Sequence, residues 1–241
     1  MNSLLKKASA LLFAATLITA CHVNGFNKVT GNKNVITKER TVNEPFTKID
    51  VSQGITVYIS MSEQTSLTVE ADENLHEHIK TEVHNGVLKI FTEETIWKAK
   101  ARNVYIKAAN INGMKASSGS EVISDNTLIS SNFDIKASSG ASMKLLLNSE
   151  TVFSSSSSGS SIELIGKSYS HTSKASSGSD IDAFALNSKE AIVNVSSGAS
   201  IDVNATENLV AKASSGGSIS YNGNPKNIER KSSSGGAISA Q

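Results

Sequence analysis

Lysine recurs at one position of a repeat in the second half of the chain, and a row of lysines suits an anionic ligand. The repeat is Ser-Ser-Gly, often preceded by Lys-Ala, as in KASSGSD at residues 174–180. The position four residues before each glycine is occupied by Lys115, Lys136, Ser155, Lys174, Asn194, Lys212 and Lys231. Two interpretations stay open. Lysines on exposed strands prevent wrong strand pairing, whereas a basic stripe would contact an anionic glycan or lipopolysaccharide, because a polyanion relieves the repulsion between stacked like charges.

Three carboxylates, Asp180, Asp182 and Asp202, are the nearest approach to a catalytic cluster. Polysaccharide lyases and hydrolases need clustered carboxylates, often with a basic residue that transfers a proton. All three lie an even number of residues after the repeat glycine, which predicts that they face solvent as solubilising charges. The many serines lack a Gly-x-Ser-x-Gly motif and a recurring histidine, so we expect no nucleophilic serine. We predict no catalytic residues.

One short segment, His76-Glu77-His78, has ligands of the kind that metals prefer. In a strand, residues two apart share a face and could bind one ion together. A third and a fourth ligand are not evident in the sequence. We therefore predict an exposed polar turn, and neither a metal site nor a cofactor.

The spacing of the repeat predicts how these residues are positioned. Successive repeat glycines are 18 to 21 residues apart, at Gly119, Gly140, Gly159, Gly178, Gly198, Gly216 and Gly235. A repeat of this length indicates a solenoid. Three residues after each glycine the chain has an apolar residue: Val122, Met143, Ile162, Ile181, Ile201, Ile219 and Ile238.

Apolar and polar residues alternate around each glycine, which is the period of a β-strand. We therefore predict an all-β fold, a parallel β-helix of coils of about 19–20 residues, right-handed because parallel crossovers usually are. The alternation also predicts that the serine before each glycine points inward, forming a buried file of Ser118, Ser139, Ser158, Ser177, Ser197, Ser215 and Ser234.

The first half is strand-rich with a looser repeat. Alternating segments predict strands at residues 55–60, 66–71, 86–91 and 103–108, with a hairpin or corner at His84-Asn85-Gly86 and a single helical turn within 72–80. We predict an N-terminal β domain at residues 35–114 that caps the solenoid, followed by the β-helix at residues 115–241.

The N-terminus has the features of an exported lipoprotein. Lys6 and Lys7 precede an apolar stretch that ends in Ile-Thr-Ala before Cys21, the only cysteine in the chain. This pattern predicts a lipoprotein signal peptide at residues 1–20 and a lipidated Cys21 at the start of a polar tether, residues 21–34. The alternative is an ordinary secretory signal with an incidental cysteine. The predicted location is the bacterial cell envelope, as an outer-membrane lipoprotein with its lipid in the membrane.

Composition and charge exclude some functions. Removing Lys6 and Lys7 from the 23 basic residues leaves 21 against 22 acidic ones, so we expect no nucleic-acid partner. Aromatic residues make up only 5% of the chain, which predicts a core of small and aliphatic side chains.

The segments FTKIDVSQGITVYIS and LTVEADENLHEHIKTEVHNGVLKIF, followed by the serial KASSG coils, resemble the head GIN domain family of bacteroidete envelope proteins. The resemblance covers about residues 35–235. It implies an all-β protein with a β-helical part and a family named for putative autotransporter-type adhesins, and it implies no activity. We therefore expect a non-enzymatic envelope lipoprotein, an adhesin or binding module whose β-helical faces contact an anionic glycan or a surface protein. The alternatives are a polysaccharide-active enzyme on a β-helix and a structural protein that stacks end to end.

Overall fold

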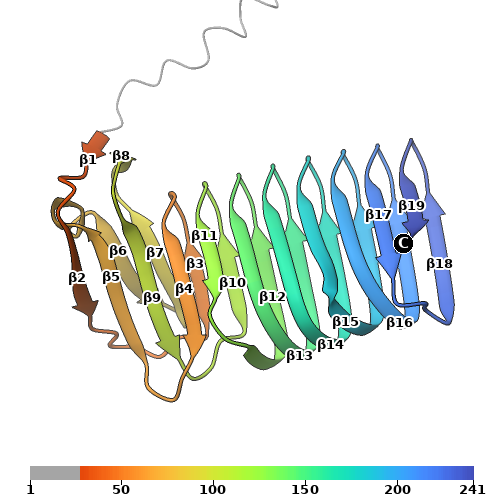
Figure 1. Cartoon of the computed structure of the whole chain (residues 1–241), viewed down its shortest axis with the longest axis horizontal. Helices are drawn as coiled ribbons and strands as arrows, with labels where there is room; N and C mark the ends of the chain where they lie inside the picture. Colours follow the sequence, from red (N-terminus) through yellow and green to blue (C-terminus); the bar gives the residue numbers. More distant parts are fainter. Residues whose placement is uncertain (1–27) are drawn as a thin grey trace, which may run out of the picture.

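The computed structural model describes residues 28–241, which form an all-β protein built on a parallel β-solenoid, as predicted (Figure 1). Seventeen of the strands make one continuous sheet, and β1 (Lys28–Thr30) and β8 (Thr95–Lys98) form a separate parallel pair. The predicted signal peptide and Cys21 lie outside the described residues.

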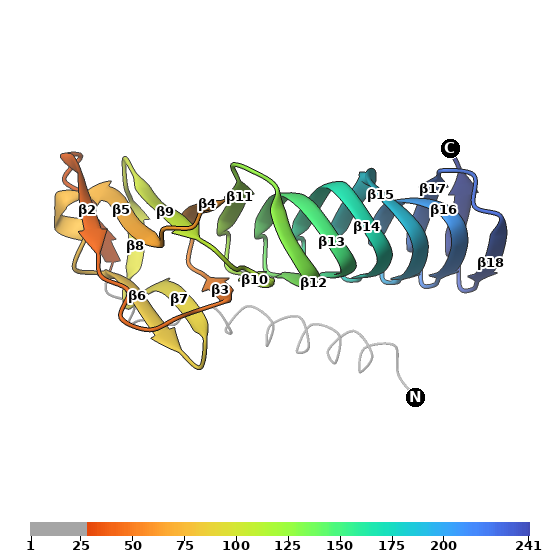
Figure 2. The ribbon, with the colours of Figure 1, turned by 90° about the horizontal axis from the view of Figure 1, so that it is seen from below.

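Each coil of the solenoid is about 19 residues long and is formed by one long strand or by two shorter ones. The long strands bend between two faces, so the coils are flattened and follow one another along the axis (Figure 2). The solenoid strands are β10 (Gly113–Ala116), β11 (Glu121–Ser124), β12 (Leu128–Ala137), β13 (Ser142–Ser156), β14 (Ser161–Ala175), β15 (Asp180–Val195), β16 (Ser200–Ala213), β17 (Ser218–Asn222), β18 (Asn227–Ser232) and β19 (Ala237–Ala240).

Aliphatic side chains stack inside the coils in the predicted register. Ile162 of β14 is paired with Ile181 of β15, which is paired with Ile201 of β16. All three are fully buried. Each buried isoleucine contributes roughly 1.5–3 kcal/mol of transfer free energy, so the apolar columns stabilise the stack from coil to coil.

The Ser-Ser-Gly corners turn the chain with two consecutive left-handed residues. The serine before each glycine has a φ of 47° to 56°, and the glycine itself has a φ of 66° to 77°. Each glycine N–H from Gly119 to Gly216 donates a hydrogen bond of 3.0–3.2 Å to the carbonyl of the serine before the next repeat glycine. The corners therefore stack as regularly as the strands.

The predicted inward file of serines is wrong. The serine before each glycine, from Ser118 to Ser234, is exposed at the tip of the corner, because two left-handed residues interrupt the alternation of the strand. The residue after the glycine points inward instead. Where that residue is Ser120, Ser160 or Ser179, its hydroxyl donates to the carbonyl of the serine three residues earlier at 2.7–2.8 Å.

One polar cluster is buried among the aliphatic columns. His171 of β14 lies in an inward column between Val152 and Ala191 and is fully buried. Its Nε2 is 2.9 Å from the hydroxyl of Ser154, which donates to the hydroxyl of Ser173 at 2.9 Å. Within residues 28–241, the Nδ1 of His171 has no hydrogen-bond partner. Burial lowers the pKa of His171 to about 4.

The N-terminal strands lie at one end of the stack (Figure 1). The predicted strands at residues 55–60, 66–71, 86–91 and 103–108 are confirmed as β4, β5, β7 and β9. The strands are β1 (Lys28–Thr30), β2 (Val35–Arg40), β3 (Lys48–Val51), β4 (Thr56–Met61), β5 (Ser66–Asp72), β6 (Ile79–His84), β7 (Val87–Thr92), β8 (Thr95–Lys98) and β9 (Arg102–Ala108), with one 3-10 turn, η2 (Glu73–Leu75), where a helical turn is predicted.

The stacking of coils begins before the first Ser-Ser-Gly. Strands β3 and β4 flank a corner of the same kind, in which Gln53 and Gly54 have φ values of 64° and 70°. β3 pairs in parallel with β10, and β4 pairs in parallel with β11. The predicted division into residues 35–114 and 115–241 stays a prediction, because one sheet runs through both parts.

Antiparallel strands and one buried carboxylate complete the N-terminal end. β5 pairs antiparallel with β2 and β9, and β6 and β7 form the predicted hairpin at Asn85-Gly86. Burial acts to raise the pKa of Asp72, but the backbone N–H groups of Ala101, Lys33 and Lys100, which donate to its carboxylate at 2.9–3.1 Å, outweigh that effect and lower the pKa. The carboxylate of Asp72 thus holds the loop that contains Lys33 against the loop that contains Lys100 and Ala101.

Candidate ligand-binding face

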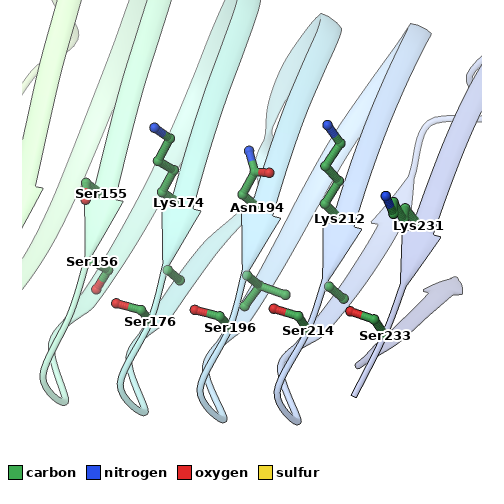
Figure 3. A pocket seen from close by; sticks show the side chains of 13 residues that line it. Ser155, Ser156, Lys174, Ser176, Asn194, Ser196, Lys212, Ser214, Lys231 and Ser233 are labelled. Atoms are coloured by element: carbon green, nitrogen blue, oxygen red, sulfur yellow. The ribbon is translucent and has the colours of Figure 1, made fainter. Parts of the chain in front are cut away.

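The residues four before each repeat glycine form a single column on one outer face. They are neighbours in the parallel ladder, in the order Lys115, Lys136, Ser155, Lys174, Asn194, Lys212 and Lys231. Successive members are one strand spacing, about 4.8 Å, apart along the backbone. Figure 3 shows the side chains of Lys174, Asn194 and Lys212 extending to the same side of the sheet. We call this set the lysine column.

Ion pairing divides the lysine column into two parts. The ammonium group of Lys115 is 2.9 Å from the carboxylate of Asp50, and that of Lys136 is 2.8 Å from Asp134. Among residues 28–241, no carboxylate lies within 4.0 Å of the ammonium groups of the other three lysines. The uncompensated positive charge is therefore concentrated in the later coils, at Lys174, Lys212 and Lys231.

The three lysines without a carboxylate partner line a shallow groove of about 550 Å³. Asn194 also lines it, as do hydroxyls of the serines two before each glycine, Ser176, Ser196, Ser214 and Ser233. In Figure 3 these hydroxyls point in one direction along the groove. Ammonium, amide and hydroxyl donors side by side are groups that bind carboxylates and sugar hydroxyls. We call this groove the lysine groove.

A second outward column, beside the lysine column, carries exposed apolar side chains. Phe153, Thr172, Ile192 and Val210 are neighbours in the ladder, each two residues before a member of the lysine column. Phe153 is 46% exposed and Ile192 is 45% exposed. Our sequence reasoning missed this column. The available signal was an apolar residue at an outward position of the period-two pattern.

The three candidate carboxylates lie on outward positions after the corner, as the pattern predicts. Burial and the nearby charges of Asp180 and Asp182 raise the pKa of Asp202, although a hydrogen bond from Ser220 acts to lower it. Ser200 donates a hydrogen bond to the carboxylate of Asp180. No lysine, arginine or histidine of the described chain forms an ion pair with these three carboxylates. The arrangement offers carboxylates without a basic partner for proton transfer.

The two histidines of the candidate metal segment do not act together. The segment directly follows the 3-10 turn η2 and is a turn rather than a strand. The predicted exposed turn is wrong for His76, which is buried, with Nε2 3.1 Å from the carbonyl of Ile36, and burial lowers its pKa. His78 has Nδ1 2.8 Å from a carboxylate oxygen of Glu94. Residues 28–241 contain no group of three or more His, Cys, Asp or Glu side chains that could hold a metal ion. In the same part of the chain, no helix has the length and apolar character needed to span a bilayer.

Comparison with known proteins identifies relatives of the fold. A family model described as "Putative auto-transporter adhesin, head GIN domain" matches residues 45–225. A search of curated proteins finds no match. A solved structure described as a putative adhesin from Bacteroides fragilis NCTC 9343 is similar over 88% of this chain and 100% of its own, with 22% identity and a TM-score of 0.83.

Two further structures share the fold. One, described as a putative lipid binding protein from Parabacteroides distasonis ATCC 8503, covers 89% of this chain and 100% of its own at 20% identity, with a TM-score of 0.71. The other, described as a putative adhesin from Parabacteroides merdae ATCC 43184, covers 89% of this chain and 99% of its own at 20% identity, with a TM-score of 0.68.

Proposed function

The chain belongs to the family described as "Putative auto-transporter adhesin, head GIN domain", and from this premise we propose that it is a non-enzymatic binding module that holds an anionic glycan in the lysine groove. The family and the adhesin-like structures are consistent with a binding role at the cell envelope or cell surface. The observation that carries the proposal is the concentration of Lys174, Lys212 and Lys231, without carboxylate partners in the described chain, along one groove.

Like-charge repulsion gives this groove an affinity for polyanions. Lys212 and Lys231 are direct neighbours in the ladder, and Lys174 is separated from Lys212 only by Asn194. Like charges opposite one another in a sheet are destabilising. Carboxylates of a bound glycan would remove this repulsion, and hydroxyls of the groove serines would hydrogen-bond to the sugars.

The two alternative functions are less well supported by the arrangement of residues. Asp180, Asp182 and Asp202 lack the basic partner that proton transfer in polysaccharide cleavage needs. In the last described coil, Arg230 occupies an inward column and donates a hydrogen bond to the hydroxyl of Tyr221 at 3.3 Å. A further coil stacked there would have to bury the guanidinium group, and inward charges of this kind oppose association of sheet edges.

The proposed function includes attachment to the membrane through a lipid on Cys21, which precedes the first described strand, β1. Replacing Cys21 by serine is expected to move the protein from the membrane fraction to the soluble fraction of the envelope, because the proposed acyl chains, which together anchor a protein stably, depend on the cysteine thiol. Membrane fractionation followed by immunoblotting measures this. An unchanged membrane fraction for Cys21→Ser would contradict lipidation.

The glycan-binding proposal is tested by two matched double variants of one column. Lys174→Ser with Lys212→Ser is expected to weaken binding to an acidic polysaccharide about tenfold, since exposed charge pairs contribute roughly 0.2–1 kcal/mol each. Serine is tolerated in this column, where it occurs naturally at Ser155. The measurement is the salt concentration that elutes the protein from immobilised hyaluronan and alginate.

The control is Lys115→Ser with Lys136→Ser, which removes the same charge from the same column where Asp50 and Asp134 already neutralise it. It should elute close to the parent protein. Equal losses in both double variants would show that total charge, and not the groove, causes retention. Retention of the Lys174/Lys212 variant equal to that of the parent would leave the lysine column as a solubility device.

A further inference from the structure

Over four successive coils, from β13 to β16, the lysine column and the apolar column beside it alternate in a complementary way. Where the lysine column is interrupted, by Ser155 and by Asn194, the neighbouring residue of the apolar column is large and exposed, Phe153 and Ile192 respectively. Beside Lys174 and Lys212, the neighbouring residues of the apolar column are Thr172 and Val210, whose side chains are only partly exposed. The four pairs, in ladder order, are Phe153 with Ser155, Thr172 with Lys174, Ile192 with Asn194, and Val210 with Lys212.

The geometry of a parallel ladder converts this alternation into a fixed distance. Residues two apart on one strand lie side by side on the same face. Successive coils are about 4.8 Å apart, so Phe153 and Ile192 are about 10 Å apart along the axis, and Lys174 and Lys212 are separated by the same interval, one coil later. The face therefore presents an apolar, cationic, apolar, cationic sequence with a repeat of two coils.

We propose that the ligand is a linear glycan in which an acidic sugar alternates with a neutral one, lying along the coil axis with one sugar per coil. This inference rests on the proposed function and names the ligand class of the same groove. The length of a sugar in an extended chain is close to one strand spacing, so a disaccharide spans two coils. The carboxylates meet Lys174 and Lys212, and the neutral sugars place their C–H faces on Phe153 and Ile192.

The two other kinds of linear glycan fit this face less well. A polymer with a carboxylate on every sugar places charge beside Phe153 and Ile192, where the lysine column offers only a serine and an asparagine. Desolvating a carboxylate against an apolar side chain without a charged partner is unfavourable. A neutral polymer leaves the ammonium groups of Lys174 and Lys212 without anions.

Isothermal titration calorimetry of the protein with three oligosaccharides of equal length tests the proposal. The probes are a hyaluronan oligosaccharide, in which glucuronate alternates with N-acetylglucosamine, an oligomannuronate, which is acidic at every sugar, and a neutral chito-oligosaccharide. Hyaluronan is expected to bind about tenfold more tightly than oligomannuronate despite its lower charge, because burial of apolar surface adds to the ion pairs. The neutral probe should bind most weakly.

Two variants change the alternation itself. Phe153→Ser with Ile192→Ser should weaken hyaluronan binding about tenfold and change oligomannuronate binding little, since only the neutral sugars contact these side chains. Asn194→Lys, which makes the column continuously cationic from Lys174 to Lys231, should strengthen oligomannuronate binding and reduce or reverse the preference. Ile129→Ser removes an exposed apolar side chain that belongs to neither column and lines a different hollow, and it is the control that should bind all probes as the parent does.

The outcomes separate this inference from the proposed function. Equal affinities for hyaluronan and oligomannuronate, with both lost in the Lys174/Lys212 double variant, would overturn the alternating ligand and leave the glycan-binding groove in place. Unchanged hyaluronan binding in the Phe153/Ile192 variant would overturn it as well. Failure of both acidic probes to bind would overturn both proposals.

Discussion

Replacing Gly166 by alanine is expected to destabilise the protein by about 3–5 kcal/mol, the range that severe backbone conflicts reach. Gly166 has a φ of 129° and is paired with Leu147 of the preceding coil. A Cβ at Gly166 would lie 1.9 Å from the carbonyl oxygen of Leu147. Because that atom belongs to the backbone of a neighbouring strand, the clash can be relieved only by separating two coils. Chemical denaturation followed by circular dichroism measures the loss.

Gly178→Ala is the matched control, since it makes the same substitution at another glycine with positive φ. Gly178 has a φ of 66° and open space around the position of a Cβ. Its replacement should cost only about 1–2 kcal/mol, the penalty of a left-handed backbone. Comparable losses at the two positions would show that conformation alone, and not the close contact with Leu147, determines the cost.

Acidification from pH 7.5 to pH 4 is expected to remove about 3 kcal/mol of stability through His171 alone. The pKa of His171 is about 4 in the folded protein because the ring is fully buried, and its ordinary value is 6.5. Between these values the unfolded chain binds a proton that the folded chain does not. The contribution of His171 to the free energy of unfolding is therefore complete above about pH 6.5 and decreases as the pH falls towards 4.

His171→Val isolates this contribution from that of the carboxylates. Valine fits the column, where Val152 is the neighbour of His171, and the hydroxyls of Ser154 and Ser173 still bond to each other. Urea denaturation of both proteins at pH 7.5 and pH 4.5 should show a markedly smaller loss in the variant. Equal losses in the two proteins would mean that His171 is protonated in the folded state or that its environment is wetter than the contacts indicate.

Much of the solenoid could be predicted from the sequence because each coil repeats the same physical requirement. The apolar residues three after each glycine, such as Ile162, Ile181 and Ile201, must all face one interior, and a period of two leaves no other arrangement. The same reasoning failed at the corner itself. Ser177 lies between two strands, and two left-handed residues in succession break the alternation that the prediction extended through them.

Other features depend on contacts that no repeat pattern encodes. Gln53-Gly54 forms a corner like the others, but glutamine replaces the second serine of Ser-Ser-Gly in Ser52-Gln53-Gly54, so the first coil was missed. The clash at Gly166 depends on the position of the Leu147 carbonyl in the preceding coil. Neither could be found by aligning the repeats.

The candidate site was predicted in position but not in electrostatics. Periodicity alone places the lysines in one outward column, and in the structure they lie in that column. Periodicity does not reveal that Asp50, which belongs to β3 and is 65 residues distant in sequence from Lys115, neutralises the start of that column. The proposals therefore concern the later coils. There Lys174, Lys212 and Lys231 line the groove, and the exposed side chains of Phe153 and Ile192 lie beside the lysine column.

Lysine footprinting tests the binding groove most directly. The protein is acetylated with and without saturating hyaluronan oligosaccharide, and the modification of each lysine is quantified by mass spectrometry. We predict protection of Lys174, Lys212 and Lys231, with little change at Lys136 and at Lys144, which is exposed and paired with Glu163. Protection that is equal at all five lysines, or that is absent from the three in the groove, would contradict the assignment of this face as the ligand-binding site.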